Sequence, residues 1–287
     1  MRTLVVAIAL AATGCGRIGF GDLVGGGGDD VAGVDGDTSA LTCASGYVAV
    51  PPLAPYTTNA FCVAKYEMRD VQGTAVSQPA DLPWLMLTVV QARAECQALG
   101  YQLLTNNQWQ TVARQIADEG WNWSGGVAYE GVLSSGHSDS NPNIQLAASA
   151  DDDPCAGTGN VCSEVLWHKQ RRTARLGNGS VVWDFGGNAG EWADGTYGGP
   201  IAGDEWVSML AEPDTRVNTL GNDQRCANAG VTPYCGFGFI YANDIGGAIV
   251  RGSGLDWGNG AGVFSSPLWF RDFDSDWNIG FRCAYEP

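Results

Sequence analysis

One segment in the second half of the chain constrains the fold most tightly. It spans residues 181–192 and reads VVWDFGGNAGEW. Val181 to Trp183 are typical of a short buried strand, because β-branched and aromatic residues suit a pleated surface. The Gly-Gly-Asn that follows predicts a turn with unusual backbone angles. We therefore expect a buried strand that ends in a sharp turn.

The same turn is a candidate metal site. It would point backbone carbonyls inward, and Asp184 and Glu191 flank it with carboxylates. Calcium prefers about six to eight oxygen ligands of these two kinds. The alternative is a tight turn in which Asn188 and Asp184 cap their own backbone.

Four motifs in sequence order resemble the formylglycine-generating enzyme (sulfatase-modifying factor) family. They are residues 101–105 (YQLLT) with Trp109 and Ala113-Arg114, residues 187–192 (GNAGEW), residues 251–253 (RGS) and residues 278–283 (NIGFRC). The matches run from about Phe61 to Cys283. The family's domain is an elaborated C-type-lectin-like fold. The resemblance therefore implies that fold, an α+β architecture with two helices packed on antiparallel strands and long Gly-rich loops.

The resemblance also implies metal ligands. The residues that match the family's calcium ligands are Asp184, Gly187, Ala189 and Glu191, two of them acting through backbone carbonyls. Asn143 and Ile144 resemble a segment that forms a second calcium site together with a later Asp. Residues 151–153, all Asp, are the candidate partners, and a solvated acidic loop is the alternative.

The N-terminal residues resemble a bacterial lipoprotein signal peptide. Residues 1–14 combine the positive Arg2, an apolar run and small residues directly before Cys15. Lipidated Cys15 would then anchor the protein through acyl chains, and a plain secretory signal peptide is the alternative. Gly16 gives no reason for inner-membrane retention. We therefore expect a lipid-anchored protein of the cell envelope, on the outer membrane.

Composition separates a tether from a folded domain. Residues 15–40 are rich in Gly, Asp, Ser and Thr, which predicts a flexible acidic tether. Residues 41–287 form the expected domain. The net charge of −16 argues against nucleic-acid binding, because phosphates would be repelled. The whole chain has 41 Gly and 11 Trp, so the domain should be loop-rich and held together by aromatic rings.

Nine cysteines become eight once Cys15 is lipidated, an even number that suits disulfides in an oxidising compartment. Spacing suggests that Cys155 pairs with Cys162, Cys226 with Cys235, and Cys43 with Cys62. The lectin-like fold implies a bond between Cys96 and Cys283. Zinc is not expected, because the chain has no CxxC pair and only two His, His137 and His168, which we take for ordinary histidines.

Two helices are the clearest predicted elements. Thr88 and Gln91 form a capping box before a helix over residues 89–99, which Gly100 should end. Thr105 and Gln108 repeat the pattern before a second helix that Gly120 should close. Strands are expected at residues 47–50, 61–67, 181–183, 248–251 and 280–283.

Enzymes of the family oxidise a substrate cysteine with oxygen, using copper(I) held by two cysteine thiolates. Soft thiolates are the ligands that copper(I) requires. In the family this pair follows the RGGS strand, but residues 251–264 contain no Cys. We therefore expect no copper and no oxidase activity, unless Cys226 and Cys235 reach the site from another loop.

Aromatic and acidic residues alternate in the segment after Ser253. Rigid rings and carboxylates of this kind are typical of a recognition surface. Its placement resembles the variable region of lectin-like proteins diversified by retroelements. The alternative is a small aromatic core. The candidate ligand-binding residues are Trp257, Asn259, Phe264, Trp269, Phe270, Asp272, Asp274, Asp276 and Trp277.

These expectations combine into a lipid-anchored, calcium-supported module that binds an extracellular protein, peptide or glycan without catalysis. The main alternative is a formylglycine-generating oxidase-type enzyme of altered chemistry that acts on protein cysteine. A third possibility is a purely structural lipoprotein of the envelope.

Overall fold

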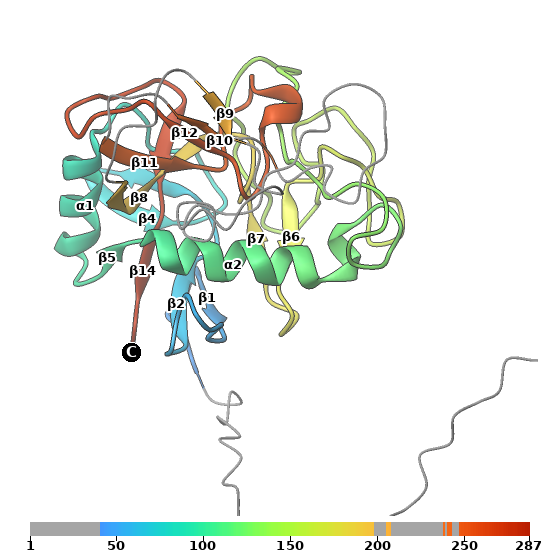
Figure 1. Ribbon diagram of the computed structural model, residues 1–287, viewed down its shortest axis with the longest axis horizontal. Coiled ribbons are helices and arrows are strands. Elements are labelled where there is room, and N and C mark those ends of the chain that lie inside the picture. The colour runs from blue at the N-terminus through green and yellow to red at the C-terminus, as the bar shows by residue number, and fades with distance from the viewer. Residues whose placement is uncertain (1–40, 198–204, 208–237, 239, 243–246) are drawn as a thin grey trace, which may run out of the picture. The chain divides into compact units, whose positions relative to one another are not determined.

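Two α-helices and five small sheets make up the part of the chain that the computed structural model describes (Figure 1). These residues are 41–197, 205–207, 238, 240–242 and 247–287. The α+β class expected from the sequence is confirmed. The signal segment, Cys15, the tether and the Cys226–Cys235 pair lie outside the described residues, so those predictions stay predictions.

Both helices begin at the predicted capping boxes. Helix α1 (Val89–Ala98) follows Thr88, whose side chain accepts a hydrogen bond from the Gln91 amide. Helix α2 (Asn106–Asp118) follows Thr105 in the same way, and it crosses the front of the view in Figure 1. It ends at Asp118 with Glu119 as its C-cap, directly before Gly120 as predicted, and a 3-10 turn η2 (Gly120–Asn122) follows. Neither helix is long and apolar enough to cross a membrane.

The strands are short, and most are paired antiparallel. The four-stranded sheet has the order β1-β2-β14-β5, two three-stranded sheets have the orders β11-β8-β13 and β12-β10-β9, and two hairpins are β3-β4 and β6-β7. Their bounds are β1 Tyr47–Val50, β2 Phe61–Ala64, β3 Met68–Val71, β4 Thr74–Ser77, β5 Gln102–Leu103, β6 Thr173–Arg175, β7 Val181–Trp183, β8 Gly190–Tyr197, β9 Glu205–Val207, β10 Ile240–Ala242, β11 Gly247–Arg251, β12 Ser266–Leu268, β13 Ile279–Phe281 and β14 Cys283–Tyr285. A second 3-10 turn, η3, spans Gly258–Gly260.

Two predicted strands have different limits in the structure. The strand expected at residues 61–67 ends at Ala64, because the chain turns there and carries Glu67 into the protein interior. The strand expected at residues 280–283 is divided at Arg282 between β13 and β14. Strand β13 pairs in parallel with β8, whereas β14 joins the four-stranded sheet. Arg282 therefore lies where the chain passes from one sheet to another.

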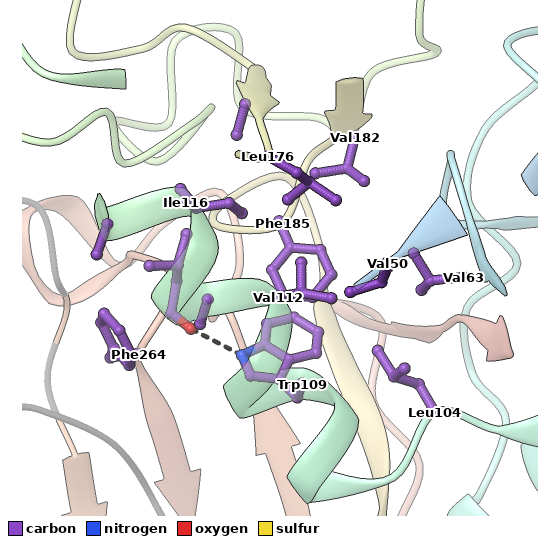
Figure 2. Packing of buried hydrophobic residues seen from close by; sticks show 14 of the residues in the cluster. Val50, Val63, Leu104, Trp109, Val112, Ile116, Leu176, Val182, Phe185 and Phe264 are labelled. Atoms are coloured by element: carbon purple, nitrogen blue, oxygen red, sulfur yellow. Dashed lines mark hydrogen bonds between the residues drawn. The ribbon is translucent and has the colours of Figure 1, made fainter. Parts of the chain in front are cut away.

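The larger hydrophobic core packs around α2 (Figure 2). The Trp109 ring stacks on Phe185, with the ring centroids 4.0 Å apart, and its Nε1 donates a hydrogen bond to the Val263 carbonyl at 2.7 Å. Phe264 belongs to this core, with 1% of its surface exposed. Its assignment to an exposed ligand surface was therefore wrong, because alternation in the sequence does not reveal which rings turn towards α2.

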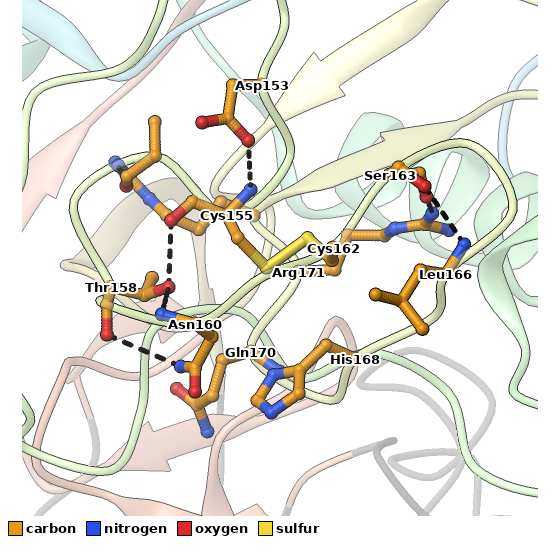
Figure 3. Close-up of a disulfide and its surroundings, with 12 residues drawn as sticks. Asp153, Cys155, Thr158, Asn160, Cys162, Ser163, Leu166, His168, Gln170 and Arg171 are labelled. Atoms are coloured by element: carbon orange, nitrogen blue, oxygen red, sulfur yellow. Dashed lines mark hydrogen bonds between the residues drawn. A yellow bond between two sulfur atoms is a disulfide. The ribbon is translucent and has the colours of Figure 1, made fainter.

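Three of the four predicted disulfides are present. Cys43–Cys62 links the segment before β1 to β2, and Cys96–Cys283 links α1 to β14. Cys155–Cys162 closes a short loop in which the Asp153 carboxylate accepts a hydrogen bond from the Cys155 amide (Figure 3). The bond implied by the lectin-like fold thus ties the first helix to the last strand.

Loop length should decide how much each disulfide stabilises the fold. Replacing Cys96 and Cys283 together by Ala should lower the free energy of unfolding by about 4–5 kcal/mol, because the bond closes a very long loop. The same change at Cys155 and Cys162, only seven positions apart, should lower it by about 2–3 kcal/mol. Urea unfolding under non-reducing conditions measures both values. Equal losses would contradict the loop-closure argument.

Candidate functional site

The turn at residues 184–191 sits in a buried cluster of opposite charges. Its acidic members are Glu67, Asp184 and Glu191, and its basic members are Arg69, Arg172 and Arg282, all at most 2% exposed. Burying a charge is tolerated only when it is paired and hydrogen-bonded. Each carboxylate of the cluster contacts a guanidinium group, although Nε and Nη2 of Arg69 have no hydrogen-bond partner among the described residues.

Two of the pairs are bidentate. Arg172 donates from Nε to Asp184 Oδ1 at 2.8 Å and from Nη2 to Oδ2 at 2.7 Å. Arg282 donates from Nε to Glu191 Oε2 at 2.8 Å and also contacts Oε1 through Nη2. Arg282 further donates to the Trp183 carbonyl at 2.8 Å. Paired parallel hydrogen bonds of this kind are the strong form of an ion pair.

Glu67 connects this cluster to the turn itself. Its carboxylate accepts hydrogen bonds from the Ala189 amide at 3.1 Å and from Asn188 Nδ2 at 2.7 Å. Burial raises the pKa of Glu67 to about 8, and the carboxylates of Asp184 and Glu191 add to the rise against the opposing effect of the arginines. Glu67 therefore holds a proton near neutral pH more readily than an exposed glutamate does.

The backbone angles of the turn require Gly at position 187 and favour Asn at position 188. Gly187 has a φ of 74°, and a Cβ there would lie 2.5 Å from the His137 carbonyl oxygen. Asn188 has a φ of 59°, in the left-handed region that Asn tolerates better than most residues. Its side chain accepts a hydrogen bond from the Leu146 amide at 2.8 Å, so it bridges two distant segments. The self-capping alternative is therefore wrong for Asn188.

The first predicted calcium site does not fit calcium in this arrangement. Both oxygens of Asp184 and both oxygens of Glu191 already accept hydrogen bonds from arginine, so neither carboxylate offers an unpaired oxygen beside Gly187 and Ala189. A cation there would also meet two guanidinium groups. Among the described residues, no three His, Cys, Asp or Glu side chains gather as a metal site would need. Calcium binding itself stays a prediction.

The second predicted calcium site is also engaged elsewhere. Asn143 is exposed, and the Ile144 carbonyl lies 3.0 Å from Nε2 of the buried His137. Of the three candidate aspartates, Asp152 contacts Lys65 Nζ at 2.9 Å and accepts a hydrogen bond from Trp183 Nε1 at 2.8 Å. The Ile144 carbonyl and Asp152 therefore act as connections within the fold.

A pocket opens beside the turn, and we call it the Trp–Asp pocket. Its cavity volume is about 190 Å³. The residues that line it come from β8, β11, β12, β13 and the loops between residues 253 and 278. They are Gly190, Val250, Ser253, Gly254, Asp256, Trp257, Pro267, Trp269, Phe270, Asp276, Trp277, Asn278 and Ile279.

Five of the nine predicted ligand-binding residues line the Trp–Asp pocket: Trp257, Trp269, Phe270, Asp276 and Trp277. Asn259, Asp272 and Asp274 lie in the same segment, but outside the pocket lining. Sequence reasoning missed Asp256 and Asn278 as site residues. Asp256 belongs to the alternating segment and could have been included, whereas Asn278 was read only as part of a strand motif.

Ring packing shapes one wall of the pocket. Trp257 and Trp269 stack with their centroids 5.2 Å apart and their planes at 15°. Phe270 follows Trp269 and packs edge-on against the buried Trp192 at 5.7 Å. Trp257 and Trp269 are half-buried, whereas Trp277 is 48% exposed. The wall is thus anchored to the core through Phe270 and open to solvent at Trp277.

The cysteines bear on the oxidase alternative. Within the described residues every cysteine, namely Cys43, Cys62, Cys96, Cys155, Cys162 and Cys283, forms a disulfide. None of them lines the Trp–Asp pocket. A free thiol pair at this site would have to come from outside the described part of the chain.

No protein-family model matches the sequence, and no curated protein matches it. Among solved structures, the Major Tropism Determinant I1 variant is 12% identical with a TM-score of 0.43, over 84% of this chain and 52% of its own. The M1 variant is 15% identical over the same shares, with a TM-score of 0.40.

Treponema denticola variable protein 1 is 11% identical with a TM-score of 0.41, over 84% of this chain and 92% of its own. This chain therefore spans about half the length of the tropism determinants and most of the length of the Treponema protein. Similarities this low fix neither a family nor a function for this chain.

Because Asp184 and Glu191 are paired with arginines, we expect the turn to be stable without calcium. Glu191→Gln should lower the free energy of unfolding by about 3–5 kcal/mol, because it leaves the Arg282 guanidinium buried and unpaired. Adding EDTA to the wild type should leave its Tm unchanged. Asp272→Asn, which removes an exposed carboxylate, is the control and should have little effect. A calcium-dependent rise in Tm that Glu191→Gln abolishes would contradict this interpretation.

Proposed function

We propose that this chain is a binding module whose Trp–Asp pocket takes an extracellular ligand without catalysis. The observation that carries the proposal is the pocket itself, which brings rings and carboxylates of one predicted recognition segment together at the surface. Such a mixture of aromatic anchors and a few polar groups is typical of binding sites. The partner is an extracellular protein, peptide or glycan.

The proposal includes an elaborated C-type-lectin-like fold of the sulfatase-modifying-factor kind. The order of the four sequence motifs supports it, as does the Cys96–Cys283 bond between the first helix and the last strand. The proposal also includes a lipid on Cys15 and a place on the outer membrane. Support for these comes from the residues before Cys15 alone.

The exposure of the rings favours a recognition surface over a small aromatic core. Phe264 packs inside, but Trp277, which lines the pocket, is 48% exposed. Rings that only stitched the loop together would be covered by their neighbours. Large exposed rings beside a pocket are instead frequent at interaction sites.

Trp277→Ala should weaken ligand binding by about 30-fold or more, because an aromatic anchor in a binding pocket commonly contributes 2 kcal/mol or more. The full chain is first tested against arrays of synthetic glycans and peptides, and each ligand found is then measured by calorimetry. Phe273→Ala is the control, since this ring is also exposed but does not line the pocket. It should retain the affinity within about threefold.

Thermal unfolding separates binding from packing in the same variants. Trp277→Ala should keep a Tm close to that of the wild type, because nearly half of the ring surface is already exposed. A fall as large as that of Trp109→Ala, which removes a fully buried ring, would place Trp277 in an aromatic core. Unchanged binding by Trp277→Ala would overturn the pocket as the ligand site.

The oxidase alternative is tested directly on substrate. The copper-loaded full chain, incubated with oxygen and a peptide containing Cys-x-Pro-x-Arg, should produce no formylglycine by mass spectrometry. The reason is that copper(I) needs a pair of free thiolates, and the described cysteines are all bonded to each other. Formation of formylglycine, lost on replacement of Cys226 and Cys235 by Ser, would contradict the non-catalytic proposal.

A further inference from the structure

We propose that the ligand of the Trp–Asp pocket is an organic cation, the ammonium or guanidinium group of a Lys or Arg side chain on a protein partner. The proposal rests on the function proposed above and specifies the chemistry of the same site. Its basis is the charge and the hydrogen bonding of the residues that line the pocket.

Two carboxylates line the pocket without an opposing cation. Asp256 Oδ1 accepts a hydrogen bond from Asn278 Nδ2 at 2.8 Å, and Asp276 Oδ1 accepts one from the Asn278 amide at 2.8 Å. Neither carboxylate forms an ion pair with a described residue, and the lining contains no Lys, Arg or His. Among the described residues, the second oxygen of each carboxylate has no hydrogen-bond donor beside it and can accept a hydrogen bond from a ligand.

The Asn278 side chain fixes this pair of carboxylates in place. Asn278 is 93% buried, since only 7% of its surface is exposed, and its Oδ1 accepts a hydrogen bond from Gln145 Nε2 at 3.0 Å. Gly254 permits this packing, because a Cβ at that position would lie 2.0 Å from Asn278 Nδ2. A carboxylate held by a buried amide is positioned before the ligand arrives, which reduces the entropy lost on binding.

The aromatic residues add a second attraction of the same sign. Trp257, Trp269 and Trp277 line the pocket together with Phe270. The face of an indole ring carries negative electrostatic potential and attracts ammonium and guanidinium groups. The rings and the carboxylates of the pocket therefore both attract a cation, and both would repel an anion.

A neutral, hydroxyl-rich ligand fits the pocket less well. Such a ligand needs donors as well as acceptors from the protein, and the side-chain donors that the described lining leaves for it are the indole N–H groups of Trp257 and Trp277. The Asn278 carboxamide is already engaged at both ends, and Ser253 Oγ is hydrogen-bonded to Ser265 Oγ. The chain's net charge of −16 would also draw a basic partner towards the surface from a distance.

The test compares peptides that differ only in charge. Calorimetry on the full chain uses the capped tripeptides Gly-Lys-Gly and Gly-Arg-Gly, the Nε-acetylated Lys form, and maltotriose. We expect the cationic peptides to bind about tenfold or more tightly than the acetylated peptide or the sugar, because acetylation removes both the charge and the cation–π attraction. Lys and Arg are compared to learn which group the pocket prefers.

Matched variants assign the charge effect to the pocket. The double variant Asp256→Asn with Asp276→Asn keeps an oxygen for each hydrogen bond to Asn278 and should weaken binding of the cationic peptide about tenfold or more. The control, Asp70→Asn with Glu95→Gln, changes the net charge equally at residues outside the lining. It should change the affinity less than about twofold, because salt screens charges that do not contact the ligand.

The results separate this proposal from the function on which it rests. Equal binding of acetylated and free Lys peptides, or wild-type affinity in the Asp256→Asn, Asp276→Asn variant, would overturn the cation proposal. If Trp277→Ala still lost a neutral ligand found on the arrays, the pocket would remain the binding site. Failure of every cationic probe to bind would likewise overturn the cation proposal, while the array ligands decide the proposed function.

Discussion

The buried pair between Glu191 and Arg282 is the interaction on which the rest of the described structure depends. Arg282 lies at the crossing from β13 to β14, and Glu191 lies on β8, which pairs with β13 on one edge and β11 on the other. The pair thus joins two sheets at one point, with both side chains removed from water. Burial makes the loss of either partner expensive, because the remaining charge would have no counterion.

The Trp–Asp pocket and this charged cluster share the backbone at the start of β8. Gly190, which begins β8, lies in the pocket lining, and its neighbour Glu191 points into the cluster. Directly before the facing strand β13, Asn278 holds the pocket carboxylates, and its carbonyl accepts a hydrogen bond from the Gly190 amide at 2.8 Å. At residues 190 and 191 the backbone therefore contributes Gly190 to the pocket and Glu191 to the buried ion pair with Arg282.

Local sequence signals predicted the elements that depend on local interactions. Both capping boxes and strand β7 were found because the residues that decide them lie within four positions of one another. The pairing of Asp184 with Arg172 and of Glu191 with Arg282 was not found, since the partners are 12 and 91 positions apart. The carboxylates of the turn were therefore read as calcium ligands without knowledge of the arginines that they contact. The same limit hid the inward turn of Phe264 and the role of Asn278.

The division of charge explains how one acidic chain can have both a stable interior and an anionic pocket. In the interior, Arg172 and Arg282 neutralise Asp184 and Glu191, so the carboxylates there contribute to the fold. At the pocket, the described residues that hold the carboxylates of Asp256 and the half-buried Asp276 are the neutral amides of Asn278. An amide orients a carboxylate without cancelling its charge. The negative potential of the pocket therefore remains available to a partner, and it is strongest where the rings exclude water.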